Sequence, residues 1–473
     1  MSIFKTFPRT FWVANTIELF ERWAWYGFFM LFANYLTESS DLRGLEFSQT
    51  QKGMIMGIGT GILYFLPVIT GSIADKYGYK RMLSIAFVIY TSAFLLLPHF
   101  HSFTGVFIMY LYLAIGAALF KPIISATVAK TTNDKNSSIG FGIFYMMVNL
   151  GAFLGPMLSL LFRSSVFYIS AGMIALNFLL LFFYQEPDRK ESTESLKETI
   201  ISILRNIVIV LKDLKFVVFL VIVSGFWVMY NQLFFTLPVF ISQWVDSSNM
   251  YQFFEINIPF LANNYGVDGQ MEAEFITNFD ALFIIIFQIA VSAIVMRKKP
   301  LNTMIAGIIV ASIGMALTLF TQNVIFILIA MFVFSIGEMS ASPKITEYIG
   351  KIASTDKKAL YMGYSFLPLF IGNIGAGFIS GNVYQKMSDK YEFAKQFATE
   401  KNLDINLELT NNQLFQSIAH QANMSEQELT NTLWNIYHPS SIWIVILSIG
   451  LASAFSLIVY NWWISKKQIK QTQ

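Results

Sequence analysis

The chain has 473 residues, of which 55% are hydrophobic and only 13% are charged, and its formal net charge at pH 7 is +3. Ordinary globular proteins are about a quarter charged, so this balance excludes a soluble protein and indicates an integral membrane protein. The basic residues lie in short connectors, which gives no reason to expect nucleic-acid binding, and the lack of cysteine excludes disulfides and thiolate metal sites.

Twelve apolar runs are long enough to cross a bilayer, which takes about 17–25 helical residues. They lie at 11–36, 49–74, 82–98, 103–129, 138–161, 166–184, 216–243, 277–296, 301–321, 324–350, 360–384 and 440–465. The first run follows MSIFKTFPRT, which lacks a cleavable-signal layout, so it is expected to be a span. We predict an all-α membrane protein of two six-helix bundles, 1–185 and 216–473, joined by a cytoplasmic linker at 186–215.

The connectors predict the orientation and a few short helices. Lys and Arg gather in alternate connectors, which places both termini in the cytoplasm. The connector 244–276 has five acidic residues and no Lys or Arg, as expected on the outer side. The long outer loop 385–439 has helical spacing and predicts two or three short amphipathic helices outside the membrane, with its charges on a solvated face. A short cytoplasmic helix is predicted at 196–212.

The first span contains three charges, Glu18, Glu21 and Arg22, within the segment ELFERWAWY. A charge at bilayer depth costs a few kcal/mol, so such residues usually face a water-filled cavity and carry function. Their spacing of three and four places them on one helix face. This chemistry predicts a proton-coupled binding site; the alternative is a structural ion-pair cluster that fixes the first helix to its neighbours.

Two further charges lie within predicted spans, Lys121 in the fourth and Glu338 in the tenth. Lys121 is expected to pair with a carboxylate of the first helix or of a substrate, unless it extends to the nearby membrane interface. A carboxylate opposite Arg22 and Lys121 would make a cavity positive at one end and negative at the other. That polarity suits a zwitterion whose carboxylate meets the cations and whose ammonium meets Glu338.

Glycines recur at every fourth residue in two spans, at Gly53, Gly57 and Gly61 in the second and at Gly377 and Gly381 in the eleventh. Small residues at this spacing let helix backbones approach closely. Packing alone explains them, and a role in gating requires that the two helices meet between the halves.

Several motifs resemble a known family. The segment GSIADKYGYKR after the second span is similar to a loop of the major facilitator superfamily. Together with Glu18-x-x-Glu21-Arg22, Tyr26-Gly27 and the lysine of FKPIIS, it makes the chain resemble the proton-dependent oligopeptide transporter family. FYMMVNLGAFLGP, FWVMYNQLFFTLP and GEMSASP extend the likeness over almost the whole chain.

The resemblance implies the major facilitator fold and proton-coupled import of di- and tripeptides across the cell inner membrane, with alternating access. It implies a monomer that uses the proton gradient, with small peptides, protons and the lipid bilayer as partners and no cofactor. Proton coupling is expected of Glu18, Glu21, Arg22 and Lys121. The expected substrate-binding residues are Arg22, Tyr26, Tyr64, Lys121, Tyr145, Asn149, Asn231, Asp280, Glu338 and Ser342.

Three departures from the family pattern leave the substrate open. Ser365 stands where the family usually has Trp, Asp280 stands where it commonly has Asn, and the tenth span adds Lys344 and Glu347, which are spaced to pair. The alternative is a proton-coupled symporter for another zwitterionic or anionic solute, such as a modified amino acid. A receptor and a membrane enzyme are the other rivals. The spans offer no His/carboxylate metal cluster and no nucleophile motif, so no enzyme and no metal are expected.

Overall fold

The computed structural model describes residues 6–133, 136–188, 196–352 and 358–472, and these are mostly helical. Contacts divide the chain into two compact units. Unit 1 comprises Met1–Phe29, Gly59–Val221 and Tyr348–Phe370, and unit 2 comprises Met30–Ile58, Ile222–Glu347 and Ile371–Gln473. Because several helices pass from one unit into the other, the predicted boundaries along the chain at 185 and 216 stay a prediction.

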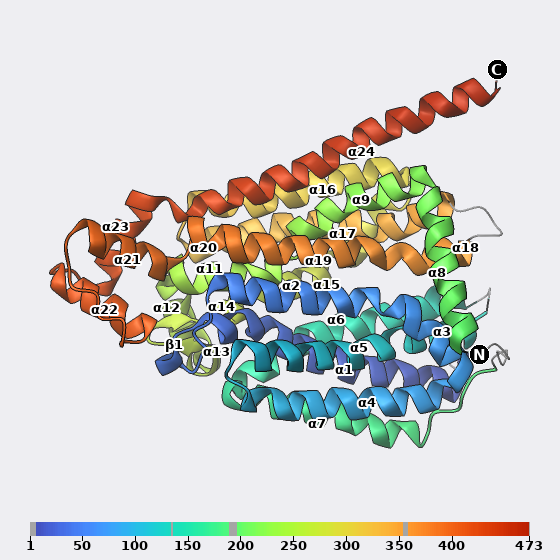
Figure 1. The fold of residues 1–473 in the computed structure, drawn as a ribbon, viewed down its shortest axis with the longest axis horizontal. Coiled ribbons are helices and arrows are strands. Elements are labelled where there is room, and N and C mark those ends of the chain that lie inside the picture. The colour runs from blue at the N-terminus through green and yellow to red at the C-terminus, as the bar shows by residue number, and fades with distance from the viewer. Residues whose placement is uncertain (1–5, 134–135, 189–195, 353–357, 473) are drawn as a thin grey trace. The chain divides into compact units, whose positions relative to one another are not determined.

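Seven helices precede the linker (Figure 1): α1 (Arg9–Thr37), α2 (Gln49–Phe65), α3 (Pro67–Tyr77), α4 (Tyr79–Leu96), α5 (Phe103–Lys130), α6 (Ser137–Leu161) and α7 (Val166–Leu181). The second span bends by 42° between α2 and α3. Pro67, the first residue of α3, explains the break because proline cannot continue the helical hydrogen bonding. The linker forms α8 (Leu196–Lys212), which confirms the helix predicted at 196–212.

The second half contains α9 (Leu214–Tyr230), α10 (Gln232–Phe235), α11 (Leu237–Trp244), α15 (Phe279–Val295), α16 (Pro300–Leu317), α17 (Val324–Ile352), α18 (Lys358–Gly363), α19 (Leu367–Phe378), α20 (Tyr384–Met387) and α24 (Ile442–Thr472). The seventh span is therefore broken twice, and Pro238 stands at the start of α11. A π-helical segment, Ile379–Val383, joins α19 to α20. Such irregular turns are frequent at functional sites.

Ten described helices are long and apolar enough to cross a membrane, or eleven when the bent pair α2–α3 is counted as one span. Each lies at one of the twelve predicted runs. The remaining run is α1, a helix of 29 residues whose charged and polar side chains lower its hydropathy. The charged residues for which a function is predicted are thus also the ones that make α1 less apolar.

Short helices and one hairpin fill the connector 244–276: α12 (Ser248–Asn257), α13 (Pro259–Tyr265), β1 (Gly266–Val267), β2 (Gln270–Met271) and α14 (Ala273–Thr277). The antiparallel strands pair Gly266 with Met271 and Val267 with Gln270. Asp268 and Gly269 between them both have positive φ, as a tight hairpin turn requires.

Three helices form what we call the cap, residues 390–437: α21 (Lys390–Glu400), α22 (Asn411–Gln421) and α23 (Glu426–Tyr437). Each has a side-chain N-cap, from Asp389, Thr410 and Ser425, and the last two are capping boxes. These caps satisfy amide groups that a helix start leaves free. The prediction of two or three short helices in the loop 385–439 is confirmed, since the cap in this loop holds three α-helices, and their place outside the membrane stays a prediction.

Within unit 2, helices from the two halves of the sequence meet at the glycine series. A methyl carbon added at Gly53 would lie 2.2 Å from the Gly377 carbonyl oxygen, and one at Gly57 would lie 2.8 Å from the Gly377 Cα. Only glycine permits this backbone contact. The prediction that the second and eleventh spans meet at these residues is confirmed, and the meeting lies toward the end of unit 2 that carries the cap.

Candidate functional site

Three charged residues of α1, Glu18, Glu21 and Arg22, form a buried cluster in unit 1. Arg22 Nε lies 2.5 Å from Glu21 Oε2, and its Nη2 also pairs with that oxygen. A second ion pair joins Arg22 Nε to Glu18 Oε1 at 3.2 Å. Tyr90 on α4 donates a hydrogen bond of 3.0 Å to Glu21 Oε1. Glu21 is therefore held at both oxygens, whereas Glu18 has one longer contact.

Burial of this cluster follows from close packing of α1 against α6. A methyl carbon added at Gly151 would lie 2.6 Å from the Arg22 Cβ, and one added at Gly155 would lie 2.5 Å from the Trp23 carbonyl oxygen. Both glycines come from the segment NLGAFLGP of α6. The approach leaves Glu21 with no exposed surface and Arg22 with 5%. Buried charges at membrane depth persist only when they are paired in this way.

Two cations of unit 1, Lys121 and Arg22, lie over aromatic rings. The ammonium nitrogen of Lys121 lies 4.3 Å from the centre of the Tyr64 ring, and Arg22 lies 5.8 Å from that of Tyr26. Lys121 makes no ion pair with the carboxylates of the described residues, although Glu18 and Glu21 act on it electrostatically. A cation held by a ring rather than by a carboxylate retains its capacity to bind an anion.

Phe366 is a further aromatic neighbour of Tyr64. Their rings are stacked with centres 6.5 Å apart, and Ser365 next to it donates a hydrogen bond to the Met362 carbonyl. Phe366, the residue after the serine that stands in place of the expected tryptophan, therefore supplies a ring beside Tyr64. The sequence could not predict this contact, because the short 3-10 turn Tyr364–Phe366 decides which side chain meets Tyr64.

Two further candidates, Tyr145 and Asn149, lie on α6. Tyr145 is 45% exposed, and the Asn149 amide donates a hydrogen bond of 2.8 Å to the Tyr145 carbonyl one helical turn away. Their proposed roles stay predictions.

The remaining candidates lie in unit 2. Asn231 stands at the break between α9 and α10, where its buried Nδ2 has no hydrogen-bond partner in the described chain. Asp280 on α15 contacts Ser335 on α17 at 2.5 Å and acts electrostatically on Glu338. Ser342, one turn further along α17, is half-buried. The expectation that Glu338 faces Arg22 and Lys121 stays a prediction, because those cations belong to unit 1.

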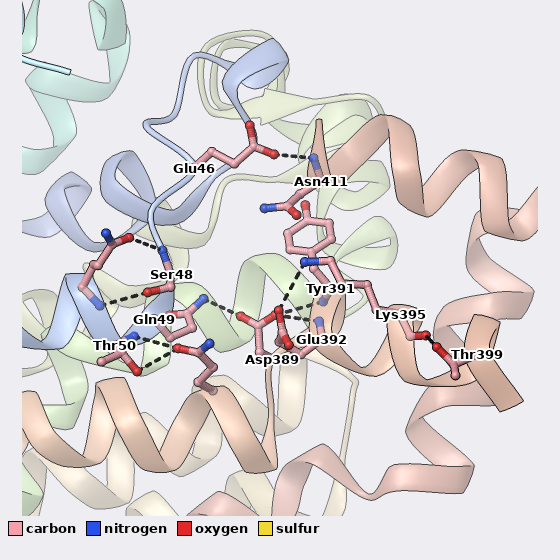
Figure 2. Close-up of polar contacts among 12 residues, drawn as sticks. Glu46, Ser48, Gln49, Thr50, Asp389, Tyr391, Glu392, Lys395, Thr399 and Asn411 are labelled. Carbon is pink, nitrogen blue, oxygen red and sulfur yellow. Dashed lines mark hydrogen bonds and ion pairs between the residues drawn. The ribbon is translucent and has the colours of Figure 1, made fainter. Parts of the chain in front are cut away.

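Polar contacts fix α2 to the second half of the sequence beside the cap (Figure 2). The Gln49 amide donates to Asp389 at 2.8 Å, and the Thr50 hydroxyl donates to Gln385 at the same distance. Lys52 is completely buried, and its ammonium donates to the Phe235 carbonyl oxygen at 2.9 Å. These bonds and the glycine contacts hold α2 against later segments of unit 2, next to the cap.

Three residues whose contacts are described above were not predicted from the sequence: Tyr90, Ser335 and Lys52. Tyr90 is one of 21 tyrosines and gives no signal of its own. Ser335 lies three residues before Glu338, so helical spacing alone could have suggested it. Lys52 stands near the start of a predicted span, where a lysine ordinarily extends to water. Among the described residues, no group of His, Asp and Glu could hold a metal ion.

Comparisons with known proteins agree with this architecture. The family model described as Major Facilitator Superfamily matches residues 16–380. An uncharacterized MFS-type transporter of Bacillus subtilis, YqjV, is 23% identical over 67% of this chain and 73% of its own. A Na(+), Li(+), K(+)/H(+) antiporter of Planococcus maritimus is 22% identical over 78% of this chain and 88% of its own.

Peptide transporters are also similar. Dipeptide and tripeptide permease A of Pectobacterium carotovorum is 29% identical, over 32% of this chain and 30% of its own. A crystal structure of a POT family transporter in complex with 5-aminolevulinic acid gives a TM-score of 0.69 at 18% identity, covering 97% of this chain and 99% of the other. These matches support the resemblance that the motifs indicated, and the structural likeness shows that the two proteins share a fold.

Proposed function

Since the chain belongs to the major facilitator superfamily, whose model matches residues 16–380, we propose that it is a proton-coupled symporter of the oligopeptide transporter family. It imports di- and tripeptides across the cell inner membrane by alternating access, with both termini in the cytoplasm and the cap outside. The observation that carries the proposal is the buried cluster of Glu18, Glu21 and Arg22, because it places titratable groups against a fixed cation inside a span.

Each part of a peptide has a candidate partner. Lys121 lies over a ring and makes no ion pair with the described residues, so it can bind the substrate carboxylate. Glu338 can bind the free ammonium. The buried Asn231 Nδ2, which has no partner in the part of the chain that the structure describes, can bind a main-chain carbonyl. Neutral donors of this kind recognise the peptide backbone without fixing the side chains. That combination suits a carrier of many short peptides.

The coupling step uses the unequal hold on the two acids of α1. Glu21 is held by Arg22 and Tyr90, whereas Glu18 has a single ion pair. Protonation of Glu18 weakens that pair and frees part of Arg22 for a substrate anion. Release of the proton on the cytoplasmic side restores the pair and expels the anion, which couples the two movements.

A second candidate function is symport of another zwitterionic solute such as a modified amino acid. Ser365 and Asp280, which depart from the family pattern, support this candidate. So does the crystal structure of a similar POT family transporter, which is in complex with 5-aminolevulinic acid.

Uptake into proteoliposomes under an imposed pH gradient tests both candidates. Labelled dialanine should accumulate with the outside acidic and compete with tripeptides but not with free amino acids or organic acids. Competition by amino-acid analogues alone would select the second candidate. Proton exchange for sodium without solute uptake would contradict symport and point to an antiporter, the activity named for the Planococcus relative.

A further inference from the structure

A cavity of about 580 Å³ lies between the end of α15, the first half of α16 and Ser340 of α17. All of its lining residues belong to unit 2, and none of the residues proposed for transport lines it. Its volume is within the range of about 300–1,000 Å³ that is usual for ligand pockets. The lining has two parts, a long apolar wall and a short basic end.

The apolar wall follows α16 into its span. Ala306 and Val310 line the cavity one helical turn apart, and Ile294 at the end of α15 lines it as well. Ile294 is 65% exposed and Ala306 is also exposed, so this wall is open to the surroundings of the helices. Val310 follows Asn302, another lining residue, by eight residues, which is about 12 Å along a helix. An open apolar wall of this length suits a hydrocarbon chain.

The basic end is formed by the connector between α15 and α16. Lys298 and Lys299 line the cavity, and Arg297 precedes them. All three are exposed, and none of them makes an ion pair with the described residues. The helix α16 begins beside them at Pro300 without a side-chain cap, and the first amide groups of a helix favour an anion. This end of the cavity is therefore suited to a phosphate group.

The two parts together distinguish a lipid from a soluble anion. A soluble anion would contact the basic end only and would leave the apolar wall, the larger part of the lining, without a partner. A phospholipid carries its phosphate and its acyl chains in the same order as the basic end and the wall. The connector 297–299 is predicted to lie on the cytoplasmic side, where anionic lipids attract Lys and Arg at the membrane surface.

We propose that this cavity, which we call the lipid groove, binds an anionic phospholipid. Lys298, Lys299 and the side-chain amide of Asn302 bind the phosphate, and one acyl chain lies along Ala306 and Val310. The binding is noncovalent. The inference goes beyond the proposed function, because a lipid in this groove is a resident ligand rather than a transported solute, and its test requires no transport.

A lipid in the groove contacts three helices at once, because Ser340 of α17 lines it together with residues of α15 and α16. A ligand that binds only the folded protein stabilises it. Phosphatidylglycerol should therefore raise the melting temperature of the purified chain in detergent more than phosphatidylcholine, whose headgroup has no net charge. An equal rise with both lipids would contradict selection of an anionic headgroup.

Native mass spectrometry of the purified full chain measures lipid binding directly. When both lipids are offered in equal amounts, the wild type should retain phosphatidylglycerol in preference. The double variant Lys298→Gln with Lys299→Gln should bind phosphatidylglycerol about 25-fold more weakly, since each basic residue near an anionic headgroup contributes about fivefold. The matched control, Lys197→Gln with Lys212→Gln, removes two exposed lysines of α8 and should leave binding unchanged. Equal losses in both double variants would show attraction by net charge alone and overturn the site.

Filling the apolar wall tests the other half of the proposal. Ala306→Phe keeps every charge but occupies the wall, so it should displace the lipid. Ala452→Phe is the matched control, since Ala452 is an exposed residue of α24 that does not line the cavity, and it should retain the lipid. Retention by Ala306→Phe would overturn the place of the acyl chain. Displacement of the lipid by excess glycerol phosphate would assign the basic end to a soluble anion and would also overturn the proposal.

Discussion

At the scale of single residues, the two acids of α1 are expected to differ although the sequence presents them alike. Glu21 accepts from Arg22 and Tyr90, whereas Glu18 has only its 3.2 Å pair with Arg22. Replacing Glu18 therefore removes a titrating group and little packing. Replacing Glu21 also removes the acceptor of two buried donors, and leaving such donors unsatisfied costs about 1–3 kcal/mol each.

We predict that Glu18→Gln abolishes proton-driven accumulation of dialanine while exchange of internal for external peptide persists. Glu21→Gln should lose accumulation and lower the melting temperature as well. Uptake, exchange and thermal unfolding in detergent would be measured on the same preparations. Equal melting temperatures for both variants would contradict the unequal hold on the two acids.

Tyr90→Phe tests the same cluster from α4. A buried hydrogen bond to a charged group contributes about 1.5–3 kcal/mol, against about 0.5–1.5 kcal/mol for a neutral pair. Tyr112→Phe is the matched control, because its hydroxyl lies 3.0 Å from the neutral Ser92 hydroxyl. The melting temperature should fall further for Tyr90→Phe, and similar losses would indicate that Glu21 does not depend on this bond.

At the scale of elements, the glycine contacts between α2 and α19 are expected to serve closure rather than folding. A side chain at Gly57 would meet backbone of the facing helix, which cannot move aside as a flexible side chain could. We predict that Gly57→Leu and Gly377→Leu each reduce uptake at least tenfold while the purified protein remains monodisperse.

Gly172→Leu on α7 is the matched control, since nothing lies within 4 Å of a methyl carbon added there. It should transport at the wild-type rate. Equal loss of folded protein and of transport in the Gly57 and Gly377 variants would indicate that these glycines serve packing only.

The connector before α2 is bound to the cap by carboxylates. Asp41 accepts from Thr410 and from the Asn412 amide, each at 2.9 Å, and Glu46 accepts from the Asn411 backbone (Figure 2). Burial is the largest single influence and raises the pKa of Asp41, but the hydrogen bonds from Ser39, Asn412 and Thr410 together outweigh it and lower that pKa from its usual value. The resulting stabilisation is present above the pKa of the unfolded chain, about 4, and is lost as the pH falls through the folded value.

Asp41→Asn should therefore lower the melting temperature at neutral pH, and the difference from wild type should vanish in acid, where Asp41 is protonated in both states. Glu255 on α12 is exposed and makes no hydrogen bond or ion pair in the described structure, so Glu255→Gln should leave the melting temperature unchanged at either pH. A deficit of Asp41→Asn that persists in acid would mean that charge is not the cause.

The positions of the helices could be predicted from the sequence more completely than the contacts between them. Hydropathy located the spans, and helical spacing located α8 and the cap helices, because these signals are local. The break at Thr236, the π-helical turn at Ile379–Val383 and the turn that brings Phe366 to Tyr64 depend on packing between distant segments. For the same reason the acids of α1 were identifiable as a site, while Tyr90 and Ser335, which are ordinary residues in sequence, were not.

At the scale of the whole molecule, the proposed mechanism gives the two charged ends of a peptide different partners. Arg22 and Lys121 are the proposed partners of the carboxylate, and Glu338 is the proposed partner of the ammonium. A peptide with both charged ends can use both partners, and this binding is proposed to drive the conformational change. A peptide with a single charged end uses only one partner, so it should bind but not drive that change.

We predict that N-acetyl-dialanine, which lacks the ammonium, and dialanine amide, which lacks the carboxylate, are transported at least tenfold more slowly than dialanine. Neutralising the protein charge that would meet the missing substrate charge should restore part of the uptake rate, because no buried protein charge is then left unpaired. Glu338→Gln should reduce the difference in uptake rate between dialanine and the acetylated peptide only. Lys121→Gln should reduce the difference in uptake rate between dialanine and the amide only. Uptake of the three peptides by the wild type and both variants would measure this crossed pattern. The same effect of both variants on both analogues would contradict the assignment of the carboxylate to Lys121 and of the ammonium to Glu338, because it would mean that the two charges act through folding rather than through substrate contact.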